Sequence, residues 1–193
     1  MILNDRWIRN SAGAGMIRPF EPSLIRQVSS QKVLSYGCSS YGYDIRLSPA
    51  DFSVFPPVPG TVMDPKAFNP ANLRNVELLA DANGRYFILP AHSYGLGVAL
   101  EHLNVPENVT VLCLGKSTYA RMGVIANMTP AEAGWRGHLT LEFSNSSGAD
   151  CRIYANEGIC QLLFFEGEAC EVTYEQRQGK YQGQAQEVTL AVV

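Results

Sequence analysis

The residue types best suited to chemistry stand together in the segment 114–123, whose sequence is LGKSTYARMG. An apolar run ends at its first glycine, and a lysine, two hydroxyl side chains and an arginine follow. Ser117 or Thr118 is predicted to cap a short helix that Gly123 ends, which places Ser117 and Arg121 on one helical face. The N–H groups of a helix start and nearby cations favour phosphate binding. An ordinary capped turn with solvated charges is the alternative interpretation.

Two familiar kinds of site are excluded by spacing. A P-loop has the pattern G-x-x-x-x-G-K-[ST], so its first glycine lies five residues before the glycine of Gly-Lys-Ser. Here that glycine is Gly115, and Thr110 occupies the position of the first glycine. The three histidines His92, His102 and His138 form no zinc-ligand pattern with the cysteines, and the zinc-deaminase pattern H-x-E with P-C-x-x-C is absent. We therefore expect neither a P-loop nor a zinc site.

A second candidate is Glu142, in the apolar stretch that follows Gly137. Period-2 alternation places Leu139, Leu141 and Phe143 on one face of a strand, and His138, Thr140, Glu142 and Ser144 on the other. If the second face is wet, Glu142 is simply exposed. If it borders a cleft, desolvation raises the pKa of Glu142, and the carboxyl group can pass protons to and from a substrate.

The third candidate is the polar C-terminal stretch, about 171–193, which is rich in Gln and Gly. It is predicted to be a mobile tail, and a frayed terminus is its simplest interpretation. Tyr174, Lys180 and the amides around Gln184 also give it an aromatic ring, a cation and hydrogen-bonding groups. These are the components of a lid over an anionic ligand.

Composition limits the class of protein. The chain has 193 residues, 46% of them hydrophobic, and a formal net charge of -3, which fits one globular domain over residues 1–193. A mildly acidic chain argues against nucleic acid as a partner. No apolar stretch is long enough to span a membrane, and the charged N-terminus argues against a secretory signal. The five cysteines include no C-x-x-C pair, so we expect reduced thiols and a cytoplasmic location.

The elements that must position these residues are mainly strands. Residues 1–25 are predicted to be the principal helical stretch, and residues 51–75, rich in proline, an extended excursion between strands. Short apolar or alternating runs separated by Gly, Pro, Asn and Ser are typical of an all-β sandwich or barrel. The clearest runs are Tyr86–Leu89, Val109–Leu114, His138–Phe143 and Gln161–Phe165.

Taken in order, these motifs resemble the dCTP deaminase family, which shares its fold with the trimeric dUTP diphosphatases. The specific matches are LGKSTYAR at 114–121 and GWRGHLTLEFSN at 134–145. Supporting matches are SYGCSSYGYDIRL at 35–47, GICQLLFF at 158–165 and GKYQGQ at 179–184. The resemblance implies a distorted antiparallel β-barrel, jelly-roll-like and of the dUTP diphosphatase type, with an N-terminal helix and a flexible C-terminal tail.

The resemblance also implies an activity and its partners. Members convert dCTP to dUTP and ammonia without zinc, with Mg²⁺ bound to the triphosphate, and supply the pathway to dUMP and dTTP. They are homotrimers whose active sites lie between subunits, and dTTP is an expected inhibitor.

Site residues carry over by motif. Glu142 corresponds to the general acid and base, while Ser117 and Arg121 hold the water and the developing charge. The remaining substrate-binding positions are Lys116 and Thr118 at the phosphates, Tyr119 and Ala120 through their backbone, Thr140 and Leu141 beside the base or sugar, and Gln161, Tyr174, Lys180 and Gln184 completing the pocket.

Glu132 leaves a second activity open. In the diphosphatases an Asp activates water against the α-phosphate within a G-V-I-D-x-x-Y-x-G pattern; here Glu132 falls at that Asp, and Trp135 at the Tyr. Glu132 is a substitute base, a partner of the sugar 3′-hydroxyl, or structural. The alternatives to a deaminase are therefore a bifunctional deaminase and diphosphatase, a dUTP diphosphatase, and a non-catalytic nucleotide-binding module.

Overall fold

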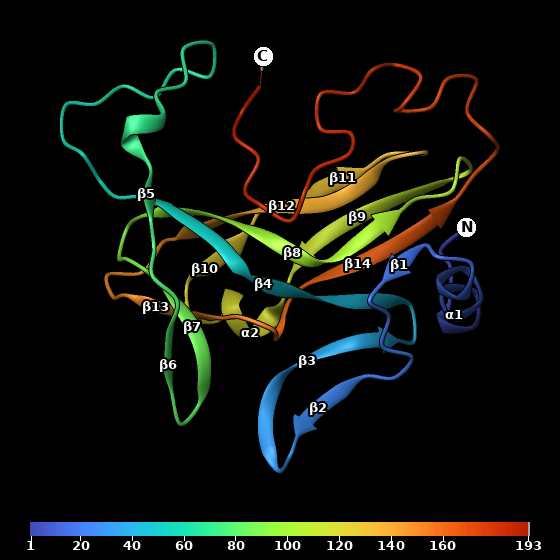
Figure 1. Ribbon diagram of the computed structural model, residues 1–193, viewed down its shortest axis with the longest axis horizontal. Helices are drawn as coiled ribbons and strands as arrows, with labels where there is room; N and C mark the ends of the chain where they lie inside the picture. Colours follow the sequence, from blue (N-terminus) through green and yellow to red (C-terminus); the bar gives the residue numbers. More distant parts are fainter. Residues whose placement is uncertain (193) are drawn as a thin grey trace.

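The structure, a computed structural model, describes residues 1–192 and is dominated by strands (Figure 1). In chain order the elements are α1 (Asp5–Gly13), β1 (Ile17–Arg18), β2 (Ile25–Val28), β3 (Gln31–Ser39), β4 (Gly42–Phe55), the 3₁₀ turn η1 (Pro70–Asn72), β5 (Arg74–Asn75), β6 (Leu79–Asp81), β7 (Gly84–Leu89), β8 (Tyr94–Asn104), β9 (Val109–Gly115), α2 (Ser117–Ala120), β10 (Val124–Ala126), β11 (Thr129–Ala131), β12 (Arg136–Asn145), β13 (Cys151–Tyr154) and β14 (Gly158–Glu166).

The strands form one large curled sheet and one small sheet. The large sheet has the order β10-β12-β8-β4-β14-β9-β11, and β1, β2, β3 and β5 pair at its margins. The small sheet has the order β13-β7-β6. All strand pairs are antiparallel. The expected mainly β, barrel-like fold is therefore confirmed.

Period-2 alternation explains the core. Leu139, Leu141 and Phe143 of β12 are buried, as predicted. The four strands predicted from apolar runs correspond to β7, β9, β12 and β14. Large side chains inside the curled sheet include Phe52 stacked between Phe87 and Phe143, with ring centroids 4.9 and 6.0 Å apart. Close-packed apolar side chains on the inner face hold the strands in register.

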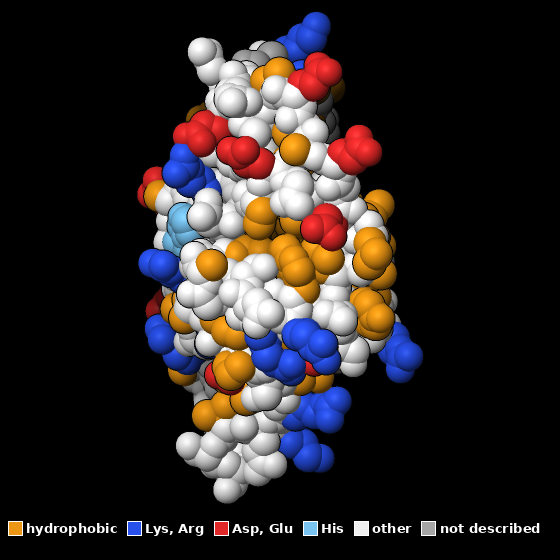
Figure 2. Space-filling model, turned by 90° about the vertical axis from the view of Figure 1, so that its right-hand side faces the viewer, with side chains coloured by type: hydrophobic (Ala, Val, Ile, Leu, Met, Phe, Trp, Pro, Cys, Tyr) orange, Lys and Arg blue, Asp and Glu red, His pale blue; other side chains and the backbone are white. Residues whose placement is uncertain are grey.

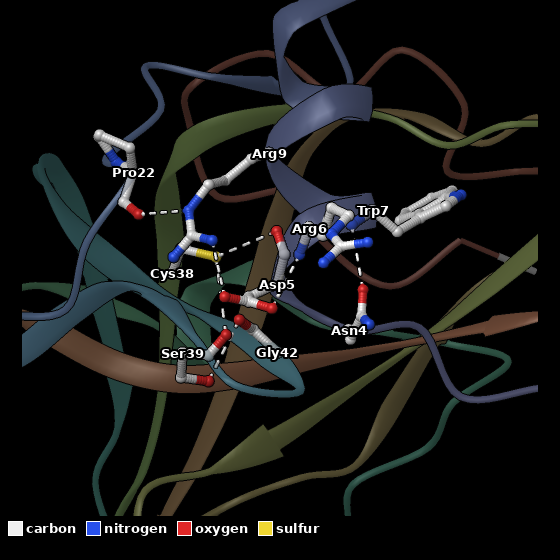
Figure 3. A network of polar contacts seen from close by, with 9 residues as sticks. All are labelled: Asn4, Asp5, Arg6, Trp7, Arg9, Pro22, Cys38, Ser39 and Gly42. Atoms are coloured by element: carbon white, nitrogen blue, oxygen red, sulfur yellow. Dashed lines mark hydrogen bonds and ion pairs between the residues drawn. The ribbon is translucent and has the colours of Figure 1, made fainter.

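Helix α1 begins at Asp5 because Asn4 caps it. The Asn4 side-chain oxygen accepts a hydrogen bond from the Trp7 N–H at 3.2 Å, and Arg9 pairs with Asp5 one turn away (Figure 3). The Arg9 guanidinium also donates to the Pro22 carbonyl, which ties the helix to the segment before β2 (Figure 3).

The prediction of a helical stretch over residues 1–25 is wrong beyond Gly13. Gly15 has a φ of 98°, a left-handed conformation that ends the helix. Pro19 and Pro22 lack the N–H groups that a continuing helix needs. The chain instead enters the sheet at β1, which pairs with β8.

The proline-rich excursion is shorter than predicted. Residues 51–55 belong to β4, which pairs with β8 as far as Phe55. The irregular segment starts at Pro56 and ends where β5 pairs with β4. It projects beyond the sheet at the upper left of Figure 1.

The C-terminal tail contains no helix or paired strand between Gly167 and Val192, apart from one bridge between Gln184 and Gly137. It lies against the segment that leads into β12: the Tyr174 N–H donates to the Ala133 carbonyl at 3.0 Å. Figure 1 shows the tail (red) looping above β11 and β12. The tail thus covers a sheet face that alternation alone left open.

The surface is uneven in charge and polarity. Figure 2 shows acidic side chains gathered toward one end of a face and Lys and Arg toward the other, with hydrophobic side chains exposed between them. Large hydrophobic side chains exposed elsewhere include Met122, Ile125 and Met128, which follow α2. Exposed apolar surface of this kind is common at protein contacts. Within residues 1–192, no helix has the length and apolar character needed to cross a bilayer.

Candidate active site

A cavity of about 1170 Å³ lies beside the outer face of β12. Four parts of the chain line it: the irregular segment after β4, the start of β8 with the turn before it, the strands β11 and β12 with their connections, and the tail. Its lining includes Phe55, Val58, Met63, Asp64, Phe68, Tyr94, Asn127, Met128, Thr129, Pro130, Glu132, Trp135, Thr140, Glu142, Tyr174, Tyr181, Gln184, Thr189 and Ala191.

Glu142 points into this cavity from β12 and is half-buried. Its Oε2 accepts a hydrogen bond from the Thr129 hydroxyl at 2.9 Å. Burial raises the pKa of Glu142 above that of an ordinary carboxyl, and the Thr129 hydrogen bond opposes the rise. Burial and the Glu142 charge together raise the pKa of Tyr94 to about 12. A desolvated carboxyl with one fixed oxygen is suited to general acid and base catalysis.

Replacing Thr129 by valine removes this hydrogen bond and is expected to raise the pKa of Glu142 further. A hydrogen bond to a charged group contributes about 1.5 kcal/mol, or about one pH unit. If the carboxylate is the base, activity falls as the pH drops through its pKa, so the acid limb of kcat/KM moves upward by about one unit. The measurement is a pH profile of Thr129→Val beside Thr129→Ser, which keeps the hydroxyl. An acid limb that stays in place in both variants contradicts this assignment.

Thr140 occupies the same face two residues earlier and is buried, so the alternative of a wet face does not hold at this position. Its N–H and hydroxyl both bond to the Gln184 side-chain oxygen, at 3.1 and 3.2 Å. Its hydroxyl also accepts from the Thr189 N–H at 3.0 Å. The tail therefore meets β12 directly beside Glu142. Tyr174 and Gln184, two of the predicted lid residues, line the cavity.

The segment 116–121 lies outside the lining of this cavity. Helix α2 is capped by Lys116 and makes no side-chain cap hydrogen bond, so the prediction that Ser117 or Thr118 caps it is wrong. Both hydroxyl residues instead lie inside the single turn. Arg121 ends the helix, and its N–H bonds to the Ser117 carbonyl at 3.1 Å. Gly123, with a φ of 85°, turns the chain into β10.

The side chains of residues 117–121 differ in their exposure to solvent. Ser117, Thr118, Ala120 and Arg121 are exposed. Tyr119 is buried, and its hydroxyl accepts the Tyr154 N–H at 2.9 Å. The buried ring fixes α2 on the barrel and leaves its polar groups facing outward.

Lys116 is held inside the chain. Its Nζ forms an ion pair with Asp44 of β4 and bonds to the Ser35 hydroxyl at 3.1 Å. The two charged side chains are 12% and 6% exposed, and the second oxygen of Asp44 has no partner among the described residues. Removing one member of a buried pair leaves the other charge uncompensated.

Replacing Lys116 by methionine is therefore expected to lower the free energy of unfolding by about 3 kcal/mol. That loss lowers the midpoint of thermal unfolding by about 6–12 °C in a domain of this size. Lys116→Arg keeps the charge and tests whether charge is what matters. Arg152→Met breaks the exposed pair with Asp81 and should cost less than about 1 kcal/mol. Equal midpoints of thermal unfolding for Lys116→Met and Arg152→Met would contradict the claim that the buried pair with Asp44 stabilises the fold more than the exposed pair does.

The remaining predicted residues also lie apart from the cavity. Leu141 is buried on the opposite face of β12. Gln161 is half-buried on β14, with its Nε2 3.4 Å from the Ser39 hydroxyl. Lys180 is exposed, and its Nζ donates to the Val192 carbonyl at 3.3 Å. Within one chain, the predicted site is thus divided between the cavity and other surfaces.

The charge of the cavity agrees with a site whose predicted residues lie partly in the cavity and partly on other surfaces of the chain. Among its described lining residues none is Lys or Arg, while Asp64, Glu132 and Glu142 are acidic. A polyanionic ligand needs cations or N–H donors near its charged groups. The described lining of a single chain therefore offers no Lys or Arg to a triphosphate, while its polar and apolar side chains suit an uncharged group such as a base and sugar.

Comparison with known proteins now identifies the family. Residues 2–167 match the dCTP deaminase-like family. The chain belongs to that family. It is 50% identical over 191 residues to the dCTP deaminase of Polaromonas sp., covering 98% of this chain and 97% of the relative. It is 49% identical over 185 residues to that of Laribacter hongkongensis, covering 95% of both.

A solved structure shows the same fold. The crystal structure of the 2'-deoxycytidine 5'-triphosphate deaminase of Agrobacterium tumefaciens matches with a TM-score of 0.58 at 20% sequence identity. The match covers 90% of this chain and 50% of that chain. This chain of the dCTP deaminase-like family therefore spans half the length of that solved relative.

Some cavity residues carried no sequence signal of their own. Thr129, Tyr94 and Tyr181 were not singled out by spacing or alternation. Thr129 lines the cavity together with Glu132. Trp135 is fixed there because its indole N–H donates to the Tyr181 carbonyl at 2.9 Å.

Proposed function

We propose that this chain deaminates dCTP to dUTP and ammonia, with Glu142 as the general acid and base. The observation that carries the proposal is the half-buried Glu142 carboxyl, with raised pKa, facing the cavity beside Thr129 and Thr140. The family membership of the chain and its curated relatives named dCTP deaminase support the same substrate.

The mechanism follows from the geometry of that carboxyl. Glu142 takes a proton from water, and the resulting hydroxide attacks C4 of cytosine. Glu142 delivers this proton to N3. It then takes the proton of the new C4 hydroxyl and passes it to the amino group, so that ammonia leaves as the C4–N4 bond breaks and the C4 carbonyl forms. Proton transfer by a positioned carboxyl contributes about 10²–10⁴-fold to the rate. The Thr129 hydrogen bond fixes one oxygen of Glu142 and leaves the other for the water.

The phosphate end of the substrate needs groups that the cavity of one chain lacks. We propose that Ser117, Thr118 and Arg121 of a second copy supply them, in a homotrimer with active sites between subunits, where Ser117 and Arg121 also hold the water and the developing charge. These groups are exposed on α2, with Tyr119 and Ala120 holding the backbone of the turn. The exposed hydrophobic side chains of Met122 and Ile125, which follow α2 in the chain, offer a surface for such a contact.

We propose that magnesium accompanies the substrate, bound to the triphosphate. Among residues 1–192 no group of three or more His, Cys, Asp or Glu is arranged to hold a metal. Mg²⁺ commonly keeps several waters and binds substrate phosphates instead of an all-protein cage. When bound, it would neutralise phosphate charge, with the triphosphate oxygens as its ligands.

The lid residues complete the proposed pocket. Tyr174 and Gln184 border the cavity, and Thr140 with Leu141 forms the strand beneath the base. Lys180 and Gln161 lie outside the lining in this structure, so they can contribute only from another copy or after the tail moves. Lys116 can reach phosphate only by releasing Asp44.

The test is product analysis with dCTP and Mg²⁺, following ammonia and pyrophosphate together. We expect ammonia and accumulating dUTP without pyrophosphate. Pyrophosphate in step with ammonia would establish the bifunctional enzyme, and pyrophosphate from dUTP without ammonia from dCTP a diphosphatase. Tight binding of dCTP with neither product would indicate a non-catalytic binding module. Addition of dTTP to the same assay tests the predicted inhibition.

The bifunctional enzyme is the second candidate because Glu132 lines the same cavity as Glu142. Glu132 is exposed, which leaves it free to meet a sugar hydroxyl or a water.

We propose that the enzyme is located in the cytoplasm, where it supplies dUTP. All five cysteines are free thiols, four of them buried, and reducing compartments favour this state.

A further inference from the structure

The last residues of the tail contribute to the cavity beyond the predicted lid. Thr189 and Ala191 line it, and both follow Gln184, the last residue that the resemblance assigns to the pocket. The Thr189 N–H donates to the Thr140 hydroxyl, two residues from Glu142. This terminal segment, residues 186–192, therefore contacts Thr140, a residue that we also place beside the substrate.

The segment reaches this place by crossing three neighbouring strands. At β12 the Gln184 carbonyl accepts the His138 N–H at 3.0 Å. At β8 the Gln186 side chain donates to the Leu100 carbonyl at 3.4 Å. At β4 the Val188 N–H donates to Oδ2 of Asp51 at 2.8 Å. Two side chains of the sheet hold the segment, Thr140 through the Thr189 N–H and Asp51 through the Val188 N–H, and Asp51 is the charged one, so its hydrogen bond is of the stronger kind.

We infer that Asp51 is a positioning residue that holds the terminal segment as a wall of the nucleotide cavity. The inference rests on the proposed function and adds a residue to it. The cavity keeps about 1170 Å³ with the segment in place, while small-molecule sites usually measure about 300–1,000 Å³. The segment therefore borders the cavity and leaves room for a ligand.

The same anchor bears on the lid cation. The Val192 carbonyl accepts the Lys180 ammonium, and the Val192 N–H donates to the Tyr181 hydroxyl at 3.2 Å. Tyr181 lines the cavity. Asp51 thus fixes the part of the chain against which Tyr181 and Lys180 are arranged.

The kinetic test compares Asp51→Ala, a chain that ends at Ala185, and the two changes combined. We expect Asp51→Ala to raise KM for dCTP about tenfold, which corresponds to about 1.4 kcal/mol, with kcat within about twofold of native. The truncated chain should show at least the same rise, and adding Asp51→Ala to it should change nothing further, because the partner of Asp51 is gone. Asp51→Asn keeps an acceptor oxygen and should rescue KM.

A second measurement needs no activity. Trypsin cleavage after Lys180 in the nucleotide-free protein should accelerate in Asp51→Ala and stay native-like in Asp51→Asn. If the native protein releases no ammonia from dCTP, the proposed function fails while cleavage still tests Asp51. Unchanged cleavage in Asp51→Ala overturns the inference, as does faster cleavage with unchanged KM. A truncated chain with lower KM also overturns it, because the segment would then obstruct the cavity.

Discussion

Replacing Glu142 by glutamine is expected to lower kcat for dCTP deamination by about 10²–10⁴-fold. The amide keeps the size of the side chain and can still accept the Thr129 hydrogen bond, but it cannot take a proton from water. Binding of dCTP should therefore change little. Ammonia release measures the first effect, and calorimetric titration with dCTP measures the second.

Glu132→Gln is the matched control, because Glu132 is a second carboxyl in the lining of the same cavity. It should keep most of the deaminase activity. If it instead removes pyrophosphate release and leaves ammonia release intact, the enzyme is bifunctional and Glu132 is the base of the diphosphatase reaction. Native kcat in Glu142→Gln would eliminate Glu142 as the proton shuttle.

Mixing two inactive variants is expected to restore activity if the sites lie between copies. Arg121→Ala loses the cation on α2, and Glu142→Gln loses the base in the cavity. A cyclic trimer containing both kinds of subunit has one site in which both groups are native. Co-expression with two affinity tags and purification through both should yield about one third of the native kcat.

The control for this experiment pairs Arg121→Ala with Ser117→Ala. Both changes lie on α2, so no mixed trimer of these two variants contains a fully native site. This pair should recover no activity beyond its separate members. Mixed trimers of Arg121→Ala and Glu142→Gln that remain inactive would show that Arg121 and Glu142 do not meet across an interface in the way proposed.

Much of the fold could be predicted because strand patterns are local. The alternation of Leu139, Leu141 and Phe143 depends only on the two-residue period of a strand, and all three are buried. Helix length was overestimated because the prediction rested on the composition of residues 1–25, which does not show where a helix ends. A helix needs an end signal, and Gly15 supplies it by adopting a left-handed conformation that composition over residues 1–25 did not reveal.

The candidate site was predicted in its chemistry but not in its arrangement. The place of Glu142 in the strand left open whether it is exposed or faces a cleft, and the resemblance to the family implied its role as a proton shuttle. That Lys116 is held by Asp44 could not be predicted, because these residues are 72 positions apart and both are charged types that occur more often on surfaces. A buried ion pair of this kind has no signature in local sequence.

The sequence by itself thus determined the strands β7, β9, β12 and β14, the face of β12 that carries Glu142, and the polar groups of α2. Each of these depends on residues within one or two turns or pleats of the backbone. The tertiary structure decided the burial of Thr140 beneath the tail, through Thr189, 49 residues away, and the hold of Asp51 on Val188, 137 residues away. Such contacts depend on where the curled sheet brings distant segments together, because hydrogen bonds to the backbone can form with almost any residue type.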